Sequence, residues 1–213
     1  MLFYSLYLLK EIDLGQMKAS TPQVARLDAS LMRIWLLGIF ISALTYAGLF
    51  YINSWLTSSF LYSTGVNWIY LPAGLRLFLT LVFGLPGAIG IALVSFLISY
   101  CGELSDDLIV CVGTGFISGF APYLARIFVL RNIELAPDLS NLNLPKLLIC
   151  ILVYAALSAG LHQFWYSTVD LDDAGTINHF FAMFIGDVLG SVLLISLIKY
   201  GLDLVKRFRK IDL

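Results

Sequence analysis

Residues 68–99 read WIYLPAGLRLFLTLVFGLPGAIGIALVSFLIS and contain a single charged side chain, Arg76. A helix that crosses the roughly 30 Å hydrocarbon core of a bilayer needs about 20 apolar residues. This run is therefore too long for one span without a large tilt. The segment GLPG at 84–87 divides it, and glycine next to proline usually marks a turn. We expect two short helices, 68–85 and 86–101, joined by a tight reversal, with a re-entrant hairpin as the alternative.

The composition of the whole chain is that of a membrane protein. Of its 213 residues, 60% are hydrophobic and 13% are charged, whereas soluble domains average about 25% charged residues. Four further apolar runs lie at 34–56, 108–130, 147–166 and 179–200. Together with the two short helices they predict an all-α polytopic transmembrane bundle with six spans. The expected partner is the lipid bilayer, and the absence of a basic patch with interleaved aromatics excludes a nucleic-acid partner.

The basic residues predict the orientation of these spans. Apart from Arg76, they lie before the first span, around the connection between the fourth and fifth, and after the sixth. The loops 57–67, 102–107 and 167–178 contain no Lys or Arg. Because basic loop residues stay in the cytoplasm, both ends of the chain should be cytoplasmic. An odd number of spans would place one basic terminus outside.

The spans predict a simple division of the chain. Residues 1–33 should form a cytoplasmic or interfacial segment, 34–200 the six-helix transmembrane domain and 201–213 a basic cytoplasmic tail. Neither end is long enough for a catalytic output domain, and the start of translation at Met1 or Met17 stays open.

The three cysteines match no zinc or redox spacing. Cys101 and Cys111 flank the same loop, so a disulfide and two packed thiols are both possible there.

Two charges inside predicted spans are the first candidates for a functional site. Arg76 lies eight positions into the second span, and Asp187 lies eight positions into the sixth. Both spans run from outside to inside, so the two side chains should lie at similar depth. A central arginine costs about 2.5–3.5 kcal/mol on insertion scales. We therefore expect Arg76 and Asp187 to form an ion pair or to share a polar cavity, in either a structural or a ligand-binding role.

Two histidines are weaker candidates. His162 lies near the outer end of the fifth span and His179 begins the sixth, where they could form an outer-facing polar pocket with Asn67 and Asn178. Two histidines without a placed carboxylate make a poor metal site, so we expect no metal and no cofactor. The sequence contains no Ser-His-Asp arrangement, phosphate loop or metalloprotease motif, and we expect no enzymatic activity.

The glycines predict close helix packing. Gly84, Gly87 and Gly90 lack the strand that a dinucleotide fingerprint requires, and Gly186 with Gly190 forms a GxxxG step. Small residues at this spacing let helix backbones approach in lipid. They favour a compact bundle and are compatible with a homodimer.

Two segments resemble a known family. The stretch 68–99, with Trp68, Pro72 and Gly74 opening a span and glycines in the next, is similar to the membrane-associated sensor domains (MASE type) of bacterial receptors. The stretch 184–194, FIGDVLGSVLL, resembles the terminal span of that family. The resemblance implies a bacterial inner-membrane sensor. The chain departs from the family in its six predicted spans instead of about eight, in Arg76, and in lacking an attached signalling enzyme.

The sequence therefore predicts a sensor-like protein without catalysis of its own. It would bind a ligand or partner through an intramembrane polar site, and a cytoplasmic or membrane signalling partner would read the signal. The alternative is a substrate-binding membrane subunit of a small-molecule transporter, in which Arg76 would meet an anionic group of the substrate. A membrane-embedded enzyme is disfavoured because no nucleophile–base arrangement is apparent.

Overall fold

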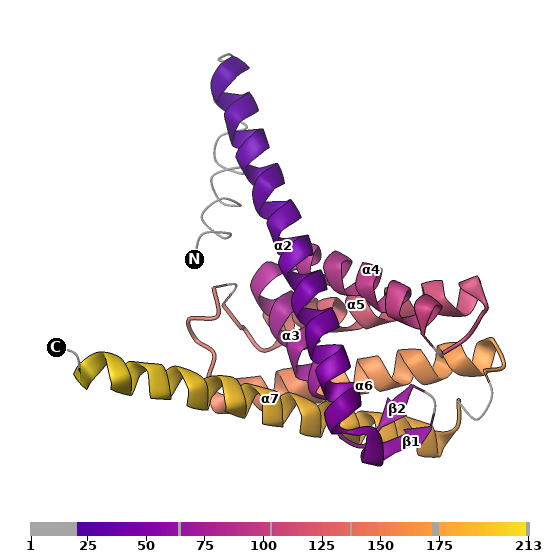
Figure 1. Cartoon of the computed structure of the whole chain (residues 1–213). Coiled ribbons are helices and arrows are strands. Elements are labelled where there is room, and N and C mark those ends of the chain that lie inside the picture. The colour runs from indigo at the N-terminus through magenta and orange to yellow at the C-terminus, as the bar shows by residue number, and fades with distance from the viewer. Residues whose placement is uncertain (1–20, 64, 103, 137, 172–174, 212–213) are drawn as a thin grey trace.

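The computed structural model describes residues 21–63, 65–102, 104–136, 138–171 and 175–211 (Figure 1). The helices in these ranges are α2 (Thr21–Leu56), α3 (Leu71–Phe83), α4 (Leu85–Cys101), α5 (Leu108–Asn132), α6 (Leu144–Thr168) and α7 (Ile177–Ile211). A short 3-10 helix, η1 (Ser58–Phe60), and an antiparallel hairpin of β1 (Leu61–Ser63) and β2 (Val66–Asn67) connect α2 to α3. The predicted all-α fold is confirmed, while the small hairpin in the 57–67 loop was not predicted.

Four of the helices are long and apolar enough to cross a membrane: α2 from Ser30 to Leu56, all of α5 and α6, and α7 from Ile177 to Gly201. The spans in α5, α6 and α7 are each 25 residues long, which is about 38 Å at 1.5 Å per residue. The helices α3 and α4 have 13 and 17 residues and are apolar but shorter. The chain is thus a multi-pass membrane protein with four long helices and a shorter pair.

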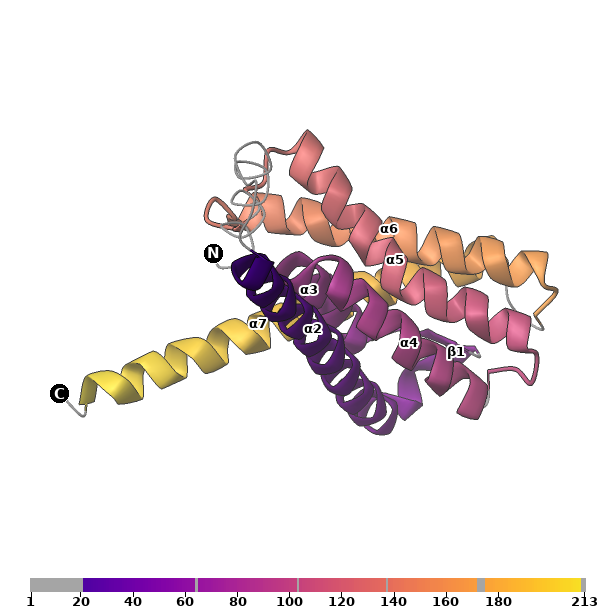
Figure 2. The same ribbon diagram turned by 90° about the horizontal axis from the view of Figure 1, so that it is seen from above.

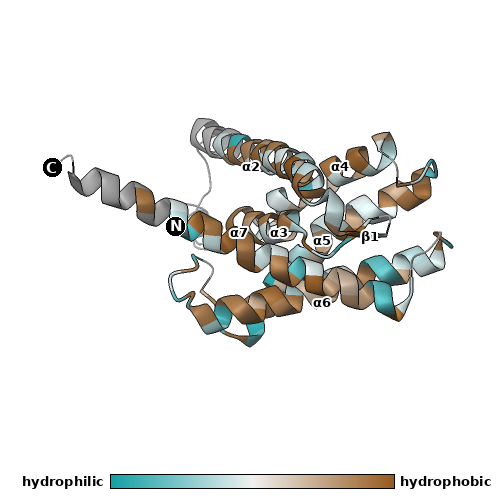
Figure 3. Ribbon diagram, turned by 60° about the horizontal axis from the view of Figure 1, so that its bottom comes forward, coloured by the Kyte–Doolittle hydropathy of each residue, from teal (hydrophilic) through white to brown (hydrophobic). Residues whose placement is uncertain are grey.

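The outer surface of the bundle is apolar, as a surface in contact with lipid should be. Large apolar side chains point outward along the spans, including Phe40 at 65%, Ile109 at 65% and Phe164 at 71% exposure. Figure 3 shows hydrophobic residues along the outer sides of several helices. Inside the hydrocarbon region the backbone must satisfy its own hydrogen bonds, as helices do.

The short pair α3 and α4 reverses direction at one residue. Gly84 has φ +64° and is the only residue between the two helices. A left-handed backbone conformation carries little cost at glycine, and Pro86 occupies the first turn of α4, where its missing N–H is tolerated. The predicted division of residues 68–101 into two helices is therefore what the structure has, with the turn at Gly84.

The ends of the helices gather into two groups. The backbone at Gly65 lies against Leu104 and Tyr166, and the Tyr62 ring packs edge-on to His179 with centroids 5.2 Å apart. The hairpin and the connections α4–α5 and α6–α7 thus meet at one end of the bundle, which we call the hairpin end. The α5–α6 connection and the far end of α7 lie at the opposite end (Figure 2).

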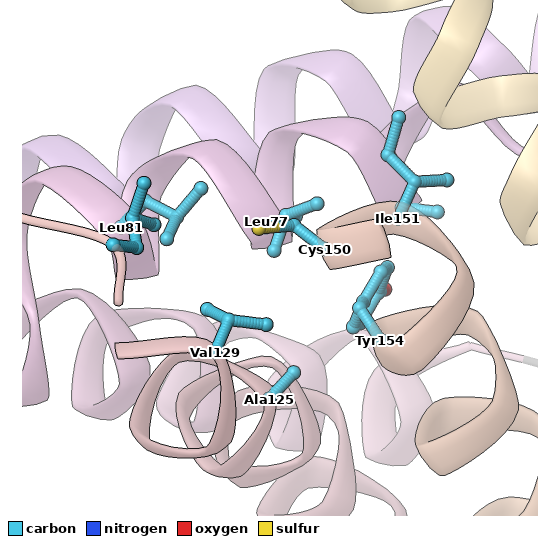
Figure 4. Close-up of a cluster of buried hydrophobic side chains, with 9 residues drawn as sticks. Leu77, Leu81, Ala125, Val129, Cys150, Ile151 and Tyr154 are labelled. Atoms are coloured by element: carbon cyan, nitrogen blue, oxygen red, sulfur yellow. The ribbon is translucent and has the colours of Figure 1, made fainter. Parts of the chain in front are cut away.

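The helix α3 is central although it is short. It contacts each of the other five helices, and eight of its 13 residues are buried. Leu77 and Leu81 of α3 pack with side chains of α5 and α6 in the largest apolar cluster (Figure 4). Any polar side chain on the buried faces of α3 is therefore surrounded by protein and not by lipid.

The glycines singled out in the sequence lie at close backbone contacts. A Cβ on Gly87 would meet the Leu79 carbonyl, and one on Gly90 would meet the Ile39 carbonyl of α2. On α7, a Cβ on Gly186 would overlap the carbonyl of Asn67, and one on Gly190 would overlap the carbonyl of Tyr70. The Tyr70 amide donates to the Gly186 carbonyl at 3.1 Å. The chain entering α3 is thus pressed directly against α7.

Two helices extend beyond their predicted spans. The described part of the 1–33 segment, from Thr21 onward, is continuous with α2, and residues 1–20, which include Met1 and Met17, lie outside the described residues. The helix α7 continues through most of the predicted 201–213 tail to Ile211. Cys101 is an exposed free thiol and Cys111 a buried one, so the structure has no disulfide between them.

Candidate functional site

Several buried polar side chains line one cavity of about 450 Å³ inside the bundle. All six helices and the hairpin region contribute to its wall. Its lining includes exposed residues at the hairpin end, such as Tyr51, Cys101 and Gly102, and deeply buried residues such as Arg76 and Asp187. The cavity therefore leads from an opening at the hairpin end to a polar interior, and its volume lies within the usual range of about 300–1,000 Å³ for small-molecule sites.

Arg76 is held in the cavity by two tyrosines. Its side chain is 4% exposed, and its Nε and Nη2 donate to the Tyr46 hydroxyl at 3.1 and 2.7 Å. Nη2 also donates to the Tyr70 hydroxyl at 2.8 Å. The guanidinium carbon lies 5.2 and 5.0 Å from the centroids of the two rings, within the range of a cation–π interaction. We call these three residues the arginine clamp.

The clamp leaves one nitrogen of Arg76 unused. Its Nη1 is buried and has no hydrogen-bond partner. Arg76 lies in the second turn of α3, and its guanidinium meets the hydroxyl of Tyr46, which lies on α2, 30 residues earlier in the chain. A rigid guanidinium with a spare donor matches the oxygens of a carboxylate or phosphate.

Asp187 faces the same cavity from α7. Its side chain is 1% exposed, and neither carboxylate oxygen has a hydrogen-bond partner. It forms no ion pair with Arg76, although the two charges are close enough to interact electrostatically. The structure thus brings Arg76 and Asp187 together as walls of one cavity, and not as a contact pair.

The surroundings of Asp187 are also incompletely bonded. The hydroxyls of Tyr154, Ser158 and Ser191 are buried and have no partner. The Ser158 hydroxyl lies beside the carboxylate without reaching hydrogen-bond geometry. We call these three residues and Asp187 the acidic wall; of the four, Asp187 lines the cavity. Buried polar groups are normally paired, so a cluster of four without partners is unusual.

His162 lies in the cavity wall near these groups. Its side chain is 1% exposed, and its Nδ1 lies 2.8 Å from the Ser158 carbonyl. Since a carbonyl only accepts, Nδ1 carries the proton, and Nε2 is left to accept from the Ser118 hydroxyl at 3.3 Å. Ser118 and His162 form a hydroxyl–imidazole contact that the sequence did not suggest, because 44 residues separate them. The orienting partner is a carbonyl and not a carboxylate, unlike a Ser-His-Asp triad.

Of the other residues of the predicted outer pocket, Asn67 lines this cavity. Asn178 is exposed and His179 is partly buried at the start of α7, and neither lines the cavity. The His179 ring instead bonds the Thr176 hydroxyl and packs on Tyr62. Among the described residues, no group of three His, Cys, Asp or Glu side chains could hold a metal.

Tyr46, Tyr70 and Ser118 are the site residues that sequence reasoning missed. Tyr46 lies in the middle of a largely apolar span, and a buried phenol hydroxyl there needs a partner. That signal could have marked it as a companion for Arg76.

No protein-family model, no curated protein and no solved structure matches the chain.

Proposed function

We propose that the chain is a sensor-like membrane receptor, without catalysis of its own, that binds a small molecule carrying an anionic group. The observation that carries this proposal is Arg76, which is fixed by Tyr46 and Tyr70 in a cavity and has an unpartnered Nη1. A buried guanidinium is costly inside a membrane, and such residues usually mark a site. An anionic ligand would complete its hydrogen bonding.

In the proposed topology both ends are cytoplasmic, in a bacterial inner membrane. The loops without Lys or Arg are those at the hairpin end, and Arg131 and Lys146 flank the α5–α6 connection at the other. Basic loops stay in the cytoplasm, so the cavity opens outward. The antiparallel pair α3 and α4 counts as two short spans or as a hairpin that enters from outside. Both versions keep the same orientation.

The sensor class rests on the two segments that resemble MASE-type domains. They include α3, α4 and the middle of α7, and they supply both Arg76 and Asp187. In the fold they lie against each other, through the contact of Tyr70 with Gly186 and Gly190. A ligand between α3 and α7 would contact both helices. Because α7 continues to the cytoplasmic end, a signalling partner there could detect a change in its position.

A substrate-binding subunit of an importer is the second candidate. The observation that favours it is the volume of the cavity, about 450 Å³, which would enclose most of a metabolite-sized ligand. An importer subunit would require its ligand to accumulate in cells with a transporter partner. A sensor would change the activity of a signalling partner without uptake.

The test is native mass spectrometry of the protein in lipid nanodiscs. Arg76→Gln removes the charge in the cavity, and Arg126→Gln is a matched control because Arg126 lies on α5 outside the cavity lining. We expect the wild type and Arg126→Gln to retain a small anionic molecule, and Arg76→Gln to lose at least tenfold in occupancy. Equal retention by Arg76→Gln, or an empty wild-type cavity, would contradict the proposal.

A further inference from the structure

The cavity presents two opposite buried charges that do not touch. Arg76 has a free donor at Nη1, and Asp187 has two free acceptor oxygens. Both side chains are more than nine-tenths buried and line the same space. An ion pair in contact would satisfy both groups at once, but here each faces the cavity with bonding capacity unused.

This arrangement discriminates between classes of ligand by charge. A simple anion bound at Arg76 would gain from the guanidinium but would also lie near the Asp187 carboxylate, which repels it. A simple cation at Asp187 would be repelled by Arg76 in the same way. In a low-dielectric site both penalties are larger than in water. A molecule with a negative group at one end and a protonated nitrogen at the other avoids both.

We infer that the ligand is a small zwitterion, whose anionic oxygens bind Arg76 and whose protonated nitrogen donates to Asp187. This inference rests on the proposed binding function and adds the second recognition group. The nitrogen must carry N–H donors, because the Asp187 oxygens are acceptors only. The Ser158 hydroxyl lies beside the Asp187 carboxylate and, like the Tyr154 hydroxyl, has no hydrogen-bond partner.

The inference defines a probe set with matched members. The L-amino acids with uncharged side chains are the zwitterions, their N-acetyl derivatives keep only the anion, and their carboxamides keep only the cation. Binding is measured as the shift of the thermal unfolding midpoint of the wild-type protein in nanodiscs, followed by titration of each probe that binds. We expect at least one free amino acid to bind about tenfold or more tightly than both of its derivatives.

Two substitutions assign the selectivity to its residue. Asp187→Asn should weaken binding of the free amino acid about tenfold to a hundredfold. Binding of its N-acetyl derivative should stay unchanged or become tighter. Asp138→Asn, in the exposed α5–α6 connection, is the matched control and should change neither. Arg76→Gln should weaken binding of the free amino acid and of the N-acetyl derivative to the same extent.

The outcomes separate this inference from the proposed function. If N-acetyl derivatives bind the wild type as tightly as the free amino acids do, the inference of a zwitterionic ligand is wrong. The proposed function as a receptor for an anionic ligand would still hold. The same holds if native mass spectrometry identifies a retained anion without a protonated nitrogen. Failure of every probe class together with an empty wild-type cavity would overturn both. Since the panel is decided on the wild type, poor folding of Asp187→Asn does not block the test.

Discussion

The arginine clamp and Asp187 of the acidic wall line one cavity, but the two groups differ in how fully their polar atoms are bonded. In the clamp, three hydrogen bonds join Arg76 to Tyr46 and Tyr70, and the two hydroxyls are 3.0 Å apart. In the acidic wall, the carboxylate of Asp187 and the three neighbouring hydroxyls have no partner. The clamp is therefore preorganised, whereas the polar groups of the acidic wall lack hydrogen-bond partners.

For the proposed ligand, the difference predicts which side of the cavity would adjust. A buried polar group without a partner costs about 1–3 kcal/mol, and this cost falls when a ligand supplies the missing hydrogen bonds. The clamp has little to gain beyond Nη1, whereas the acidic wall has several bonds to form. We therefore expect α6 and α7 to adjust on binding, with α2 and α3 as the fixed side.

The largest expected effect comes from Gly190, where α7 meets the backbone at Tyr70 of the clamp. Gly190→Leu would drive a side chain into the Tyr70 carbonyl and separate the two walls. We expect a loss of about 3 kcal/mol in unfolding free energy, measured by denaturation in mild detergent. Gly48→Leu on α2 is the control, because no atom lies within 4 Å of its Cβ position. Equal losses in both variants would show that this contact does not hold the walls together.

A smaller effect is expected within the clamp. Tyr46→Phe removes the acceptor of two Arg76 hydrogen bonds and should cost about 1–2 kcal/mol, since bonds to a charged group exceed the average in membrane helices. Tyr51→Phe is the control: Tyr51 is 63% exposed and no hydrogen bond of its hydroxyl is found in the structure. Thermal unfolding of both variants measures the difference. A neutral Tyr46→Phe would mean that Arg76 is not bonded as described.

In the acidic wall the same kind of substitution should have the opposite sign. Ser191→Ala deletes a buried hydroxyl without a partner, so the unfolding free energy should stay constant or rise by up to about 1 kcal/mol. The measurement is again thermal unfolding, without added ligand. If Ser191→Ala loses as much unfolding free energy as Tyr46→Phe, the arginine clamp and the acidic wall do not differ in the way described.

The smallest effect concerns a carboxylate that is already satisfied. The Ser140 hydroxyl and amide donate to Asp138 at 2.7 and 3.1 Å, and the hydroxyl bond is the main reason that the pKa of Asp138 lies below its ordinary value. A carboxyl whose pKa is lowered by folding stabilises the fold above its unfolded pKa. That contribution is lost as the pH falls through the lower, folded pKa. Ser140→Ala should raise the pKa of Asp138, as NMR titration would show, and an unchanged pKa would contradict it.

Much of the fold could be predicted from the sequence because length and charge determine it. The apolar runs gave the six helices, and the GLPG segment gave the reversal at Gly84. Counting positions along the second and sixth spans was enough to expect Arg76 and Asp187 at similar depth. The predicted boundaries were short at both ends, where Thr21–Arg33 and the residues after Gly201 continue as helix.

The bonding within the site could not be predicted in the same way. In a soluble helix the apolar stripe tells which face is buried, but these helices are apolar on nearly every face, so their rotation about the axis is not encoded in the pattern. The sequence therefore could not pair Tyr46 with Arg76, or Ser118 with His162. We grouped His179 with His162 because both lie near the outer ends of their predicted spans. In the structure, the His179 ring contacts Thr176 and Tyr62 instead.

The enclosure of α3 by the other five helices has a consequence for biogenesis. A 13-residue segment with a central arginine is a poor substrate for insertion by itself, because it is short and the charge opposes partitioning into lipid. The helix α2, which carries the Tyr46 acceptor, is synthesised first, and α4 follows after a single residue. We expect α3 to enter the bilayer jointly with α4 and against α2, so that its arginine passes from the translocon to a tyrosine without meeting acyl chains.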